Sequence, residues 1–339
     1  MAQEKMWALL VHLSMNFCWG WRRKGNGEEL PFDDKYWEEI LKNSVDSGIN
    51  TIVMDLGDGV KYATHPEISL PTAWSRKRVR QEVKRCKDMG ITLIPKLNFS
   101  KGHDEWIGEE YHRMTSTPTY YRMTNDLIHE VYDLFEKPEY IHLGMDEEDA
   151  RHVAGRPLAI FRQKELYWND LNYFLDSVAD TGAKPWIWSC PLFRSTEGYQ
   201  ANVGVDDAVI SPWYYHGIKK EHYQPITCWQ DYIDYYSKEP YKSMNLTYVE
   251  EDPYNTMCRS KMLPLLADGY KYIPTVSAFY NHEYNALDLM EYFRDNAKDE
   301  QILGYMTAPW AEMLPTENSK VKFEKTFRWF KEAKEKIYG

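Results

Sequence analysis

The sequence of 339 residues predicts an α/β protein, a (β/α)8 TIM barrel that forms a single domain over residues 1–339. Two observations carry this prediction. Short strand-like runs alternate with amphipathic helical runs, and the length is normal for one α/β barrel although long for an ordinary domain. A doubly wound open sheet is the alternative, but no glycine-rich phosphate loop follows any predicted strand.

The predicted strands are short runs rich in β-branched, aromatic and other apolar residues. Because helices separate them, we expect the strands to be parallel and to bring their carboxyl ends to one face of the barrel. Eight such runs occur, over residues 6–14, 50–56, 91–98, 140–146, 184–190, 207–213, 271–279 and 301–310.

Runs with apolar residues at helical spacing lie between most strands, and several end at a glycine directly before a strand, as helix C-caps do. They cover residues 33–48, 75–90, 120–136, 166–182, 255–269, 286–299 and 319–337. Residues 191–206 are too short for a good fifth helix. The Tyr-rich segment 214–255, with a possible strand at 242–249, is expected to form an elaborated loop over the active face.

The formal net charge of −11 argues against a nucleic-acid partner, and the basic run in 75–87 is interleaved with apolar residues like the solvated face of a helix. No apolar run is long enough to span a bilayer, and no signal peptide is visible, so localisation stays open. The five cysteines form no C-x-x-C, and His and Cys make no metal spacing. No disulfide framework, metal or other cofactor is expected.

The carboxyl ends of the predicted strands carry acids, amides and aromatic rings on one rim. Carboxylates and amides pair with hydroxyl groups and flat rings stack on sugar faces, so the rim indicates a carbohydrate substrate. Packing in the core remains the simpler interpretation of any single aromatic residue. The rim residues are Asp55, Asp58, Asn98, His103, Asp146, Glu147, Trp186, Trp188, Trp213, Tyr214, Tyr215, His216, Tyr280, Asn281, His282, Glu283, Trp310 and Glu312.

The segment YIHLGMDEED, residues 140–149, runs from strand-like residues into four acids. A buried carboxylate is costly unless it is paired or protonated. We expect Asp146 and Glu147 to be functional at the strand end, and Glu148 and Asp149 to begin a solvent-exposed loop. The structural alternative is an ion pair of Asp146 or Glu147 with a nearby arginine, for which Arg151 and Arg156 are the candidates.

Several segments resemble glycoside hydrolase family 20, the β-N-acetylhexosaminidases. The family's strand 4 motif H-x-G-G-D-E is similar to HLGMDE, residues 142–147, and its strand 3 motif ending in G-H is similar to residues 89–103. A strand 2 motif is matched loosely by residues 49–59, which places Asp58 on its first Asp. SAFYNHE and APWAEM resemble the family's segments at strands 7 and 8, so the resemblance runs over most of the barrel.

The resemblance implies a retaining hydrolase in which the substrate's own 2-acetamido oxygen is the nucleophile. Asp146 would stay ionised, orient the acetamide and balance the oxazolinium charge, and Glu147 would be the general acid/base. Repulsion between the two carboxylates would raise the pKa of one, as an acid catalyst near neutral pH requires. The residues expected to bind substrate are Asp58, Asn98, His103, Trp188, Trp213, Tyr280, Trp310 and Glu312.

Position on the strands refines three of these expectations. Tyr280 is expected to donate a hydrogen bond to the acetamide carbonyl, with Trp188 and Trp310 beside the acetamide methyl. For strand 184–190 we expect one of Trp186 and Trp188 to face the barrel and the other the helices, and we assign Trp188, nearer the carboxyl end, to the site.

Departures from the family pattern indicate a divergent member. Met145 replaces the second Gly of the strand 4 motif, and Lys96 and Asn98 replace the Glu and Asp of strand 3. The family's sugar-gripping Arg in strand 1 and the small domain that usually precedes the barrel have no counterpart. The residues available near strand 1 are His12, Asn16 and Arg22.

Two other functions stay open. One is a retaining glycosidase with an enzyme nucleophile, in which Glu147 is the acid/base and Glu283 the nucleophile, with carboxyls about 5–5.5 Å apart. The other is an inactive barrel that binds glycans, which the departures at Lys96 and Met145 motivate. The sequence leaves the sugar, the linkage, exo or endo action and the oligomeric state undetermined.

Overall fold

The computed structural model describes residues 4–14, 29–148, 160, 162–215, 217–219, 222, 266 and 269–339. Several sequence expectations fall almost entirely outside these ranges and are not discussed further. They are the helix over 255–269, the loop over 214–255 with its possible strand, and the residues Asn16, Arg22, Asp149, Arg151, Arg156 and His216.

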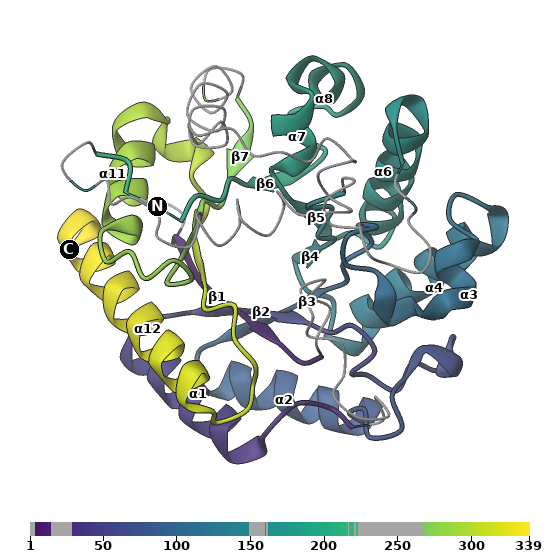
Figure 1. Ribbon diagram of the computed structural model, residues 1–339, viewed down its shortest axis with the longest axis horizontal. Helices are drawn as coiled ribbons and strands as arrows, with labels where there is room; N and C mark the ends of the chain where they lie inside the picture. The colour runs from purple at the N-terminus through teal and green to yellow at the C-terminus, as the bar shows by residue number, and fades with distance from the viewer. Residues whose placement is uncertain are drawn as a thin grey trace, which may run out of the picture.

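Nine strands form one sheet, in the order β7-β6-β5-β4-β3-β2-β1-β9-β8, and every paired neighbour is parallel. The sheet curls into an α/β barrel with helices around it (Figure 1), which confirms the predicted fold class. The strands are β1 (Met6–His12), β2 (Thr51–Asp55), β3 (Thr92–Lys96), β4 (Tyr140–His142), β5 (Lys184–Trp188), β6 (Val209–Ser211), β7 (Lys271–Tyr272), β8 (Thr275–Ser277) and β9 (Gly304–Ala308).

The ninth strand arises because the predicted strand 271–279 is broken into β7 and β8 at Pro274. Proline has no N–H to give to a ladder, so it interrupts the pairing. The chain nevertheless stays in the barrel wall: Met306 N donates to Pro274 O at 2.9 Å, and Thr275 N donates to Pro212 O at 2.8 Å. Eight predicted strands therefore account for all nine observed ones.

Helices cover the outside of the barrel, and side-chain caps mark where several begin. Asp33 accepts from Tyr36 N at the start of α1, and Ser75 and Thr117 cap α2 and α4 in the same way. The helices are α1 (Asp34–Asp46), α2 (Arg76–Asp88), α3 (Gly108–Arg113), α4 (Pro118–Leu134), α6 (Lys164–Ala179), α7 (Cys190–Arg194), α8 (Thr196–Asn202), α11 (Asn285–Asn296) and α12 (Glu317–Tyr338).

Three of these helices bear on the sequence expectations. The basic run forms α2, which buries Val79, Val83 and Cys86 and leaves its Lys and Arg residues exposed or half-buried, as predicted. Its one buried acid, Glu82, accepts a hydrogen bond from Trp37 Nε1 at 3.0 Å. The interval 191–206, judged too short for one good helix, holds the two short helices α7 and α8. None of the helices that the structure describes combines the length and the apolar character needed to cross a membrane.

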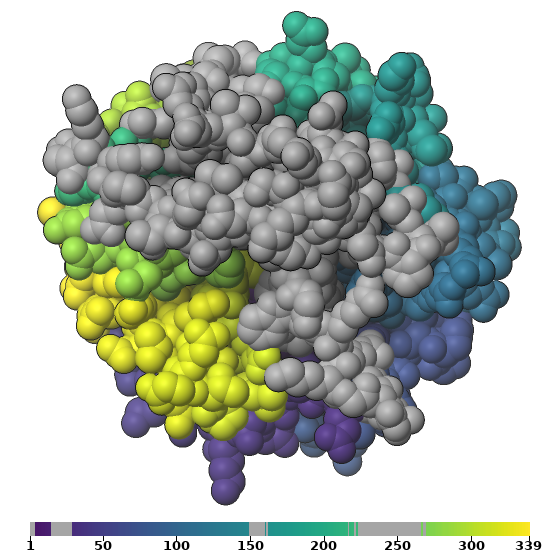
Figure 2. All heavy atoms as spheres, in the orientation of Figure 1, coloured from purple at the N-terminus to yellow at the C-terminus, as the bar shows by residue number. Residues whose placement is uncertain are grey.

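Helices from distant parts of the chain lie on opposite sides of the molecule. In the space-filling view α12 (yellow) lies on one side of the molecule and the α3–α4 region (blue) on the opposite side (Figure 2). α12 packs against α11, α1 and β9, so the last helix returns next to the first and closes the ring of helices.

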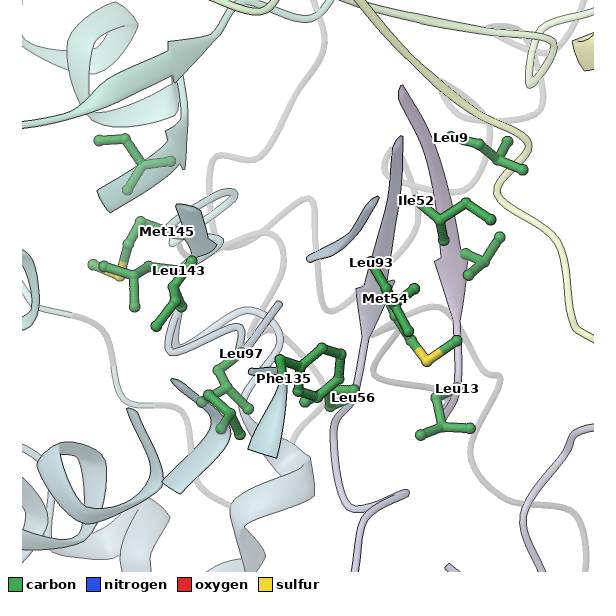
Figure 3. Close-up of a cluster of buried hydrophobic side chains, with 14 of the residues drawn as sticks. Leu9, Leu13, Ile52, Met54, Leu56, Leu93, Leu97, Phe135, Leu143 and Met145 are labelled. Atoms are coloured by element: carbon green, nitrogen blue, oxygen red, sulfur yellow. The ribbon is translucent and has the colours of Figure 1, made fainter. Parts of the chain in front are cut away.

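Strand alternation divides the hydrophobic core into two parts. Leu9, Ile52 and Leu93 belong to the larger cluster between sheet and helices, and they come from three neighbouring strands (Figure 3). Leu10 and Val53, one residue further along, belong to the smaller cluster inside the barrel. A side-chain period of two produces this division.

The same period corrects the expectation for strand 184–190. Trp186 and Trp188 both lie in the cluster inside the barrel, rather than on opposite faces. Residues i and i+2 of a strand share a face, so the expected division between barrel and helices was wrong. Trp186 is anchored by a hydrogen bond from its Nε1 to Ser211 Oγ at 2.7 Å.

Candidate active site

Two carboxylates meet one imidazole at the carboxyl ends of β3 and β4. Asn98 Nδ2 donates to Asp146 Oδ1 at 2.8 Å. His103 Nε2 lies 3.3 Å from Asp146 Oδ2 and 3.2 Å from Glu147 Oε2. Asp146 is buried and Glu147 half-buried, so the pair combines one carboxylate fixed on both sides with one that faces a more open space.

The pair is presented by an unusual backbone rather than by a regular strand. β4 ends at His142, four residues earlier than predicted, and Gly144, Met145 and Glu147 have φ values of 71°, 67° and 50°. Left-handed conformations are uncommon for residues other than glycine. The orientation of the two carboxylates therefore depends on this turn and not on the pleat of a strand.

The loop after β3 holds this turn in place. Asn98 Oδ1 accepts from Met145 N at 3.3 Å and from Ser100 N at 3.1 Å, and Ser100 Oγ donates to the main-chain oxygen of Asp146. A Cβ atom at Gly144 would lie 2.1 Å from Asn98 Oδ1. Asn98, where the family pattern has Asp, thus organises both the main chain and the side chain of the acidic pair.

Gly144→Ala is expected to lower the free energy of unfolding by about 2–5 kcal/mol, because it combines a left-handed backbone with displacement of Asn98. Gly90→Ala is the matched control, since Gly90 has φ 78° and nothing within 4 Å of an added Cβ. It should lose only about 1–2 kcal/mol. Urea unfolding measures both, and equal losses would contradict the close packing of Asn98 on Gly144.

His142 supports the first residue of the turn. Its Nδ1 accepts from Gly144 N at 3.0 Å, and its ring lies 5.0 Å from that of Trp186 and 4.9 Å from that of Trp188. Burial, together with the charge of Lys96, lowers the pKa of His142 well below its ordinary value. The imidazole is therefore neutral and acts as an acceptor.

Acidification is expected to destabilise the protein through this histidine. A group with a depressed folded pKa contributes stability that is complete above its unfolded value, 6.5, and decreases as the pH falls below it. The slope is about 1.4 kcal/mol per pH unit for one proton. His142→Gln can still accept from Gly144 without titrating, so its unfolding free energy should vary less between pH 7 and pH 5.

The measurement is urea unfolding at several pH values. His129→Gln, on the exposed face of α4, is the matched control and should keep the wild-type slope. Burial also lowers the pKa values of His12 and His282, so part of the slope should remain in His142→Gln. An unchanged slope in that variant would contradict a neutral His142.

Aromatic rings line the space beside the carboxylates. Trp188 and Trp310 have ring centroids 5.9 Å apart, and Tyr215 lies 6.3 Å from Trp310 and 6.4 Å from Tyr280. The ring of Trp213 stacks on that of Tyr215 at 5.1 Å. The four aromatic residues expected at the site thus form a connected wall, and Tyr215 is its centre.

Tyr215 belongs to the predicted rim but not to the residues that the sequence predicts to bind substrate. Burial raises the pKa of Tyr215 well above its ordinary value, and the charges of Glu147 and Asp146 act in the same direction, against a hydrogen bond with Trp310. Its hydroxyl therefore stays protonated beside the acids. In the sequence, Trp213, Tyr214 and Tyr215 offered no spacing that would single it out.

The remaining predicted residues lie at the same edge of the barrel. Asp58 is buried after β2, where Ser14 Oγ donates to its Oδ1 at 2.5 Å. Glu312 is half-buried on the loop after β9. Glu283 is exposed on the turn that precedes α11.

A buried ion pair joins the last residues of β2 and β3, where the chain departs from the family pattern. Lys96 Nζ is paired with Asp55, and His12 Nδ1 is 3.4 Å from Asp55 Oδ2. Burial opposes the charge of Asp55, but Lys96 and His12 outweigh it and lower the pKa of the carboxyl. Lys96 is thus compensated by a neighbour on β2.

Within the described part of the chain, His103, Asp146 and Glu147 are also a group that could hold a metal ion, with ligand atoms within 4.8 Å of one another. A thiol lies nearby: Trp213 Nε1 donates to Cys190 Sγ at 3.3 Å. Burial, with the charge of Asp146, raises the pKa of Cys190 to about 12, so the thiol stays protonated and is a poor nucleophile or ligand.

The expectation for Glu148 was wrong. This residue is 2% exposed and is paired with Arg162, whose Nε is 2.8 Å from Glu148 Oε1, so it does not begin a solvated loop. The sequence offered no signal for this pair, because the two residues are 14 positions apart and no motif connects them.

Solved structures with a similar fold include β-N-acetylhexosaminidases from three bacteria. The Streptomyces coelicolor protein aligns with a TM-score of 0.61 and 10% identity over 97% of this chain and 64% of its own. The Bacteroides fragilis protein aligns with 0.57 and 12%, over 95% and 65%. The Streptomyces plicatus protein aligns with 0.60 and 11%, over 97% and 64%. The chain thus spans less than two thirds of each of these relatives.

At such low identity these structures establish the fold, whereas the sequence itself establishes the family. The family model described as glycosyl hydrolase family 20, catalytic domain, matches residues 62–325. This range includes the loop after β3, the acidic pair after β4 and the aromatic wall. The chain therefore belongs to glycosyl hydrolase family 20, as the resemblance of its strand-end motifs predicted.

Proposed function

We propose that this protein hydrolyses terminal or internal N-acetylhexosaminides with retention, using the substrate's 2-acetamido group as nucleophile. The observation that supports the proposal is the pair Asp146 and Glu147 after β4, whose carboxylates both lie within 3.3 Å of His103 Nε2. Asp146 is fixed by two partners, Asn98 and His103, whereas Glu147 is half-buried and interacts electrostatically with Tyr215 of the aromatic wall.

In the first step the acetamide oxygen attacks the anomeric carbon while the bond from that carbon to the leaving oxygen breaks. Glu147 gives its proton to the leaving oxygen, and Asp146 orients the acetamide N–H and balances the positive charge of the oxazolinium ion. In the second step Glu147 takes a proton from water, which attacks the anomeric carbon and reopens the ring. Glu147 thus regains in the second step the proton that it gave up in the first, as general acid/base catalysis requires.

The aromatic wall supports an acetamide pocket in this proposal. Trp188 and Trp310 offer apolar faces for the methyl group, and a tyrosine hydroxyl would donate to the acetamide carbonyl. Tyr280 was expected in that role from its strand. Tyr215 is the second candidate, because its hydroxyl stays protonated and the charges of both carboxylates contribute to its raised pKa.

The exposed position of Glu283 favours the acetamido group over an enzyme nucleophile. A nucleophilic carboxylate works beside the acid/base, about 5–5.5 Å from it, and in a site that excludes water. An exposed side chain before α11 lacks that environment.

The test is a hydrolysis screen that compares aryl N-acetylglucosaminide and N-acetylgalactosaminide with the corresponding 2-hydroxy sugars. Turnover of at least one N-acetyl sugar and none of the 2-hydroxy sugars is the expected result. Comparable turnover of 2-hydroxy sugars would refute substrate assistance, and binding without turnover would identify an inactive glycan-binding barrel.

A further inference from the structure

Glu148, the residue after Glu147, has a carboxylate that accepts several hydrogen bonds. Arg162 approaches the Glu148 carboxylate with Nε at 2.8 Å from Oε1 and with a terminal nitrogen at 2.5 Å from Oε2. The main-chain N–H groups of Arg162 and Lys101 add bonds of 2.7 and 3.1 Å. Arg194 donates to the main-chain oxygen of Glu148. A two-pronged arginine contact fixes both distance and orientation.

Arg162 extends this contact to two other parts of the fold. It is 3% exposed, and its two terminal nitrogens donate to Asp170 Oδ2 on α6 at 3.0 Å and to Phe99 O after β3 at 2.9 Å. Burial opposes its charge, but Glu148 and Asp170 outweigh this and raise the pKa of the guanidinium well above its ordinary value. The loops after β3 and β4 are thus tied to α6 by one permanent cation.

Glu147 lies on one of the two loops that Arg162 ties together, and the other loop packs against it. A Cβ atom at Gly102 would lie 2.8 Å from Glu147 O, so the loop after β3 packs directly on the main chain of Glu147. The next residue of that loop, on the N-terminal side, is Lys101, whose N–H binds Glu148. Glu147 itself has φ 50°, a conformation that needs support from its surroundings.

We propose that Glu148, clamped by Arg162, is a positioning residue that sets the orientation of Glu147. The inference rests on the proposed function in one respect, since Glu147 is taken as the acid/base. A purely stabilising role for the Glu148–Arg162 pair is the weaker explanation. A buried ion pair often contributes no more to the stability of a protein than apolar residues of the same volume would.

Electrostatics gives the inference a signature that stability alone does not have. The titratable groups that face Glu147 are His103, Asp146, Cys190 and Tyr215, and the charged groups that face Glu148 are Arg162, Arg194, Lys101 and Asp170. Removing the negative charge of Glu148 leaves Arg162 undercompensated. The loss of this negative charge and the undercompensated positive charge of Arg162 both favour the ionised form of Glu147. Glu147 should therefore lose its proton at a lower pH in the variant than in the wild type.

The decisive variant is Glu148→Gln, which keeps the shape but places an amide donor against one prong of Arg162 or the Lys101 N–H. Its matched control is Glu130→Gln. Glu130 is also a buried carboxylate, bound by the N–H groups of Ala63 and Thr64 at 2.7 and 2.9 Å and by Arg76, but it lies on α4 away from β4's end. Both variants lose similar bonds and are expected to lose stability.

We expect Glu148→Gln to lower kcat about 10- to 100-fold with little change in KM, and to move the alkaline limb of the kcat/KM profile to lower pH. Glu130→Gln should keep the wild-type kcat and pH profile. An unshifted limb in Glu148→Gln, or an equal shift in Glu130→Gln, would overturn the inference. If Glu148→Gln does not fold, Arg162→Lys, which keeps the charge and loses the fork, should lower kcat, and an unaltered kcat there would overturn it too.

Amide hydrogen exchange separates this inference from the proposed function. In Glu148→Gln the peptide covering residues 144–148 should exchange faster than in the wild type, and in Glu130→Gln it should not. Unchanged exchange overturns the positioning role whether or not the enzyme acts on N-acetyl sugars. A wild type that is inactive on every N-acetylhexosaminide, with faster exchange in Glu148→Gln, overturns the proposed function and leaves the clamp.

Discussion

Asp146→Asn is expected to lower kcat by about 10²- to 10³-fold while leaving the protein folded. The change keeps the shape of the side chain and removes the charge that would face the oxazolinium-like transition state. Losing one preorganised electrostatic contact of this kind has an effect of that size. Asp146 is 8% exposed and held between Asn98 and His103, so solvent cannot easily replace the lost charge.

A thiazoline that mimics the cyclised intermediate reports the same contact through binding. It should bind the wild type far more tightly than substrate does, and Asp146→Asn much less tightly, because transition-state-like ligands use the interactions that catalysis uses. Titration calorimetry measures both affinities. Equal affinity of the thiazoline for the two proteins would contradict a charge-balancing role for Asp146.

Glu283→Gln is the control that separates the mechanisms. With the acetamido group as nucleophile, this exposed residue should be replaceable without loss of rate, and a 2-fluoro sugar should leave the mass of the protein unchanged. A covalent adduct on Glu283, detected by intact mass, would overturn the proposed nucleophile and leave Glu147 as acid/base.

Glu147→Gln is the second change with a large expected effect. For substrates with poor leaving groups kcat should fall by about 10²- to 10⁴-fold, the usual contribution of a general acid. For activated aryl glycosides the loss should be smaller, because their leaving groups need little protonation. Initial rates on a series of leaving groups of known pKa measure the difference.

The dependence on the leaving group is the informative part of that experiment. A plot of log kcat against leaving-group pKa should be steeper for Glu147→Gln than for the wild type. Parallel plots, with equal losses for good and poor leaving groups, would argue that Glu147 has a structural rather than a proton-donating role. Thermal unfolding of the variant checks that its fold is intact.

The sequence was a good guide where local pattern controls structure. Alternating apolar runs and helix caps predicted the barrel and the helices from residues a few positions apart, and the strand-end rule brought Asp146, Glu147, Asn98 and His103 to one rim. It was a poorer guide to strand ends, since Pro274 divides one predicted strand and β4 stops at His142. The expected division between Trp186 and Trp188 was wrong, because residues two apart on a strand share a face, whereas Trp188 faces the barrel as predicted.

Taken alone, the sequence determined the fold class and the place of the acidic pair, since periodicity and motif spacing are properties of neighbouring residues. The tertiary structure alone decided how that pair is held. Asn98 meets Asp146 across 48 positions, Lys101 meets Glu148 across 47, and Lys96 meets Asp55 across 41. Such contacts depend on which loops converge after the strands have closed into a barrel, and so does the burial that turned Glu148 from an expected surface acid into the partner of Arg162.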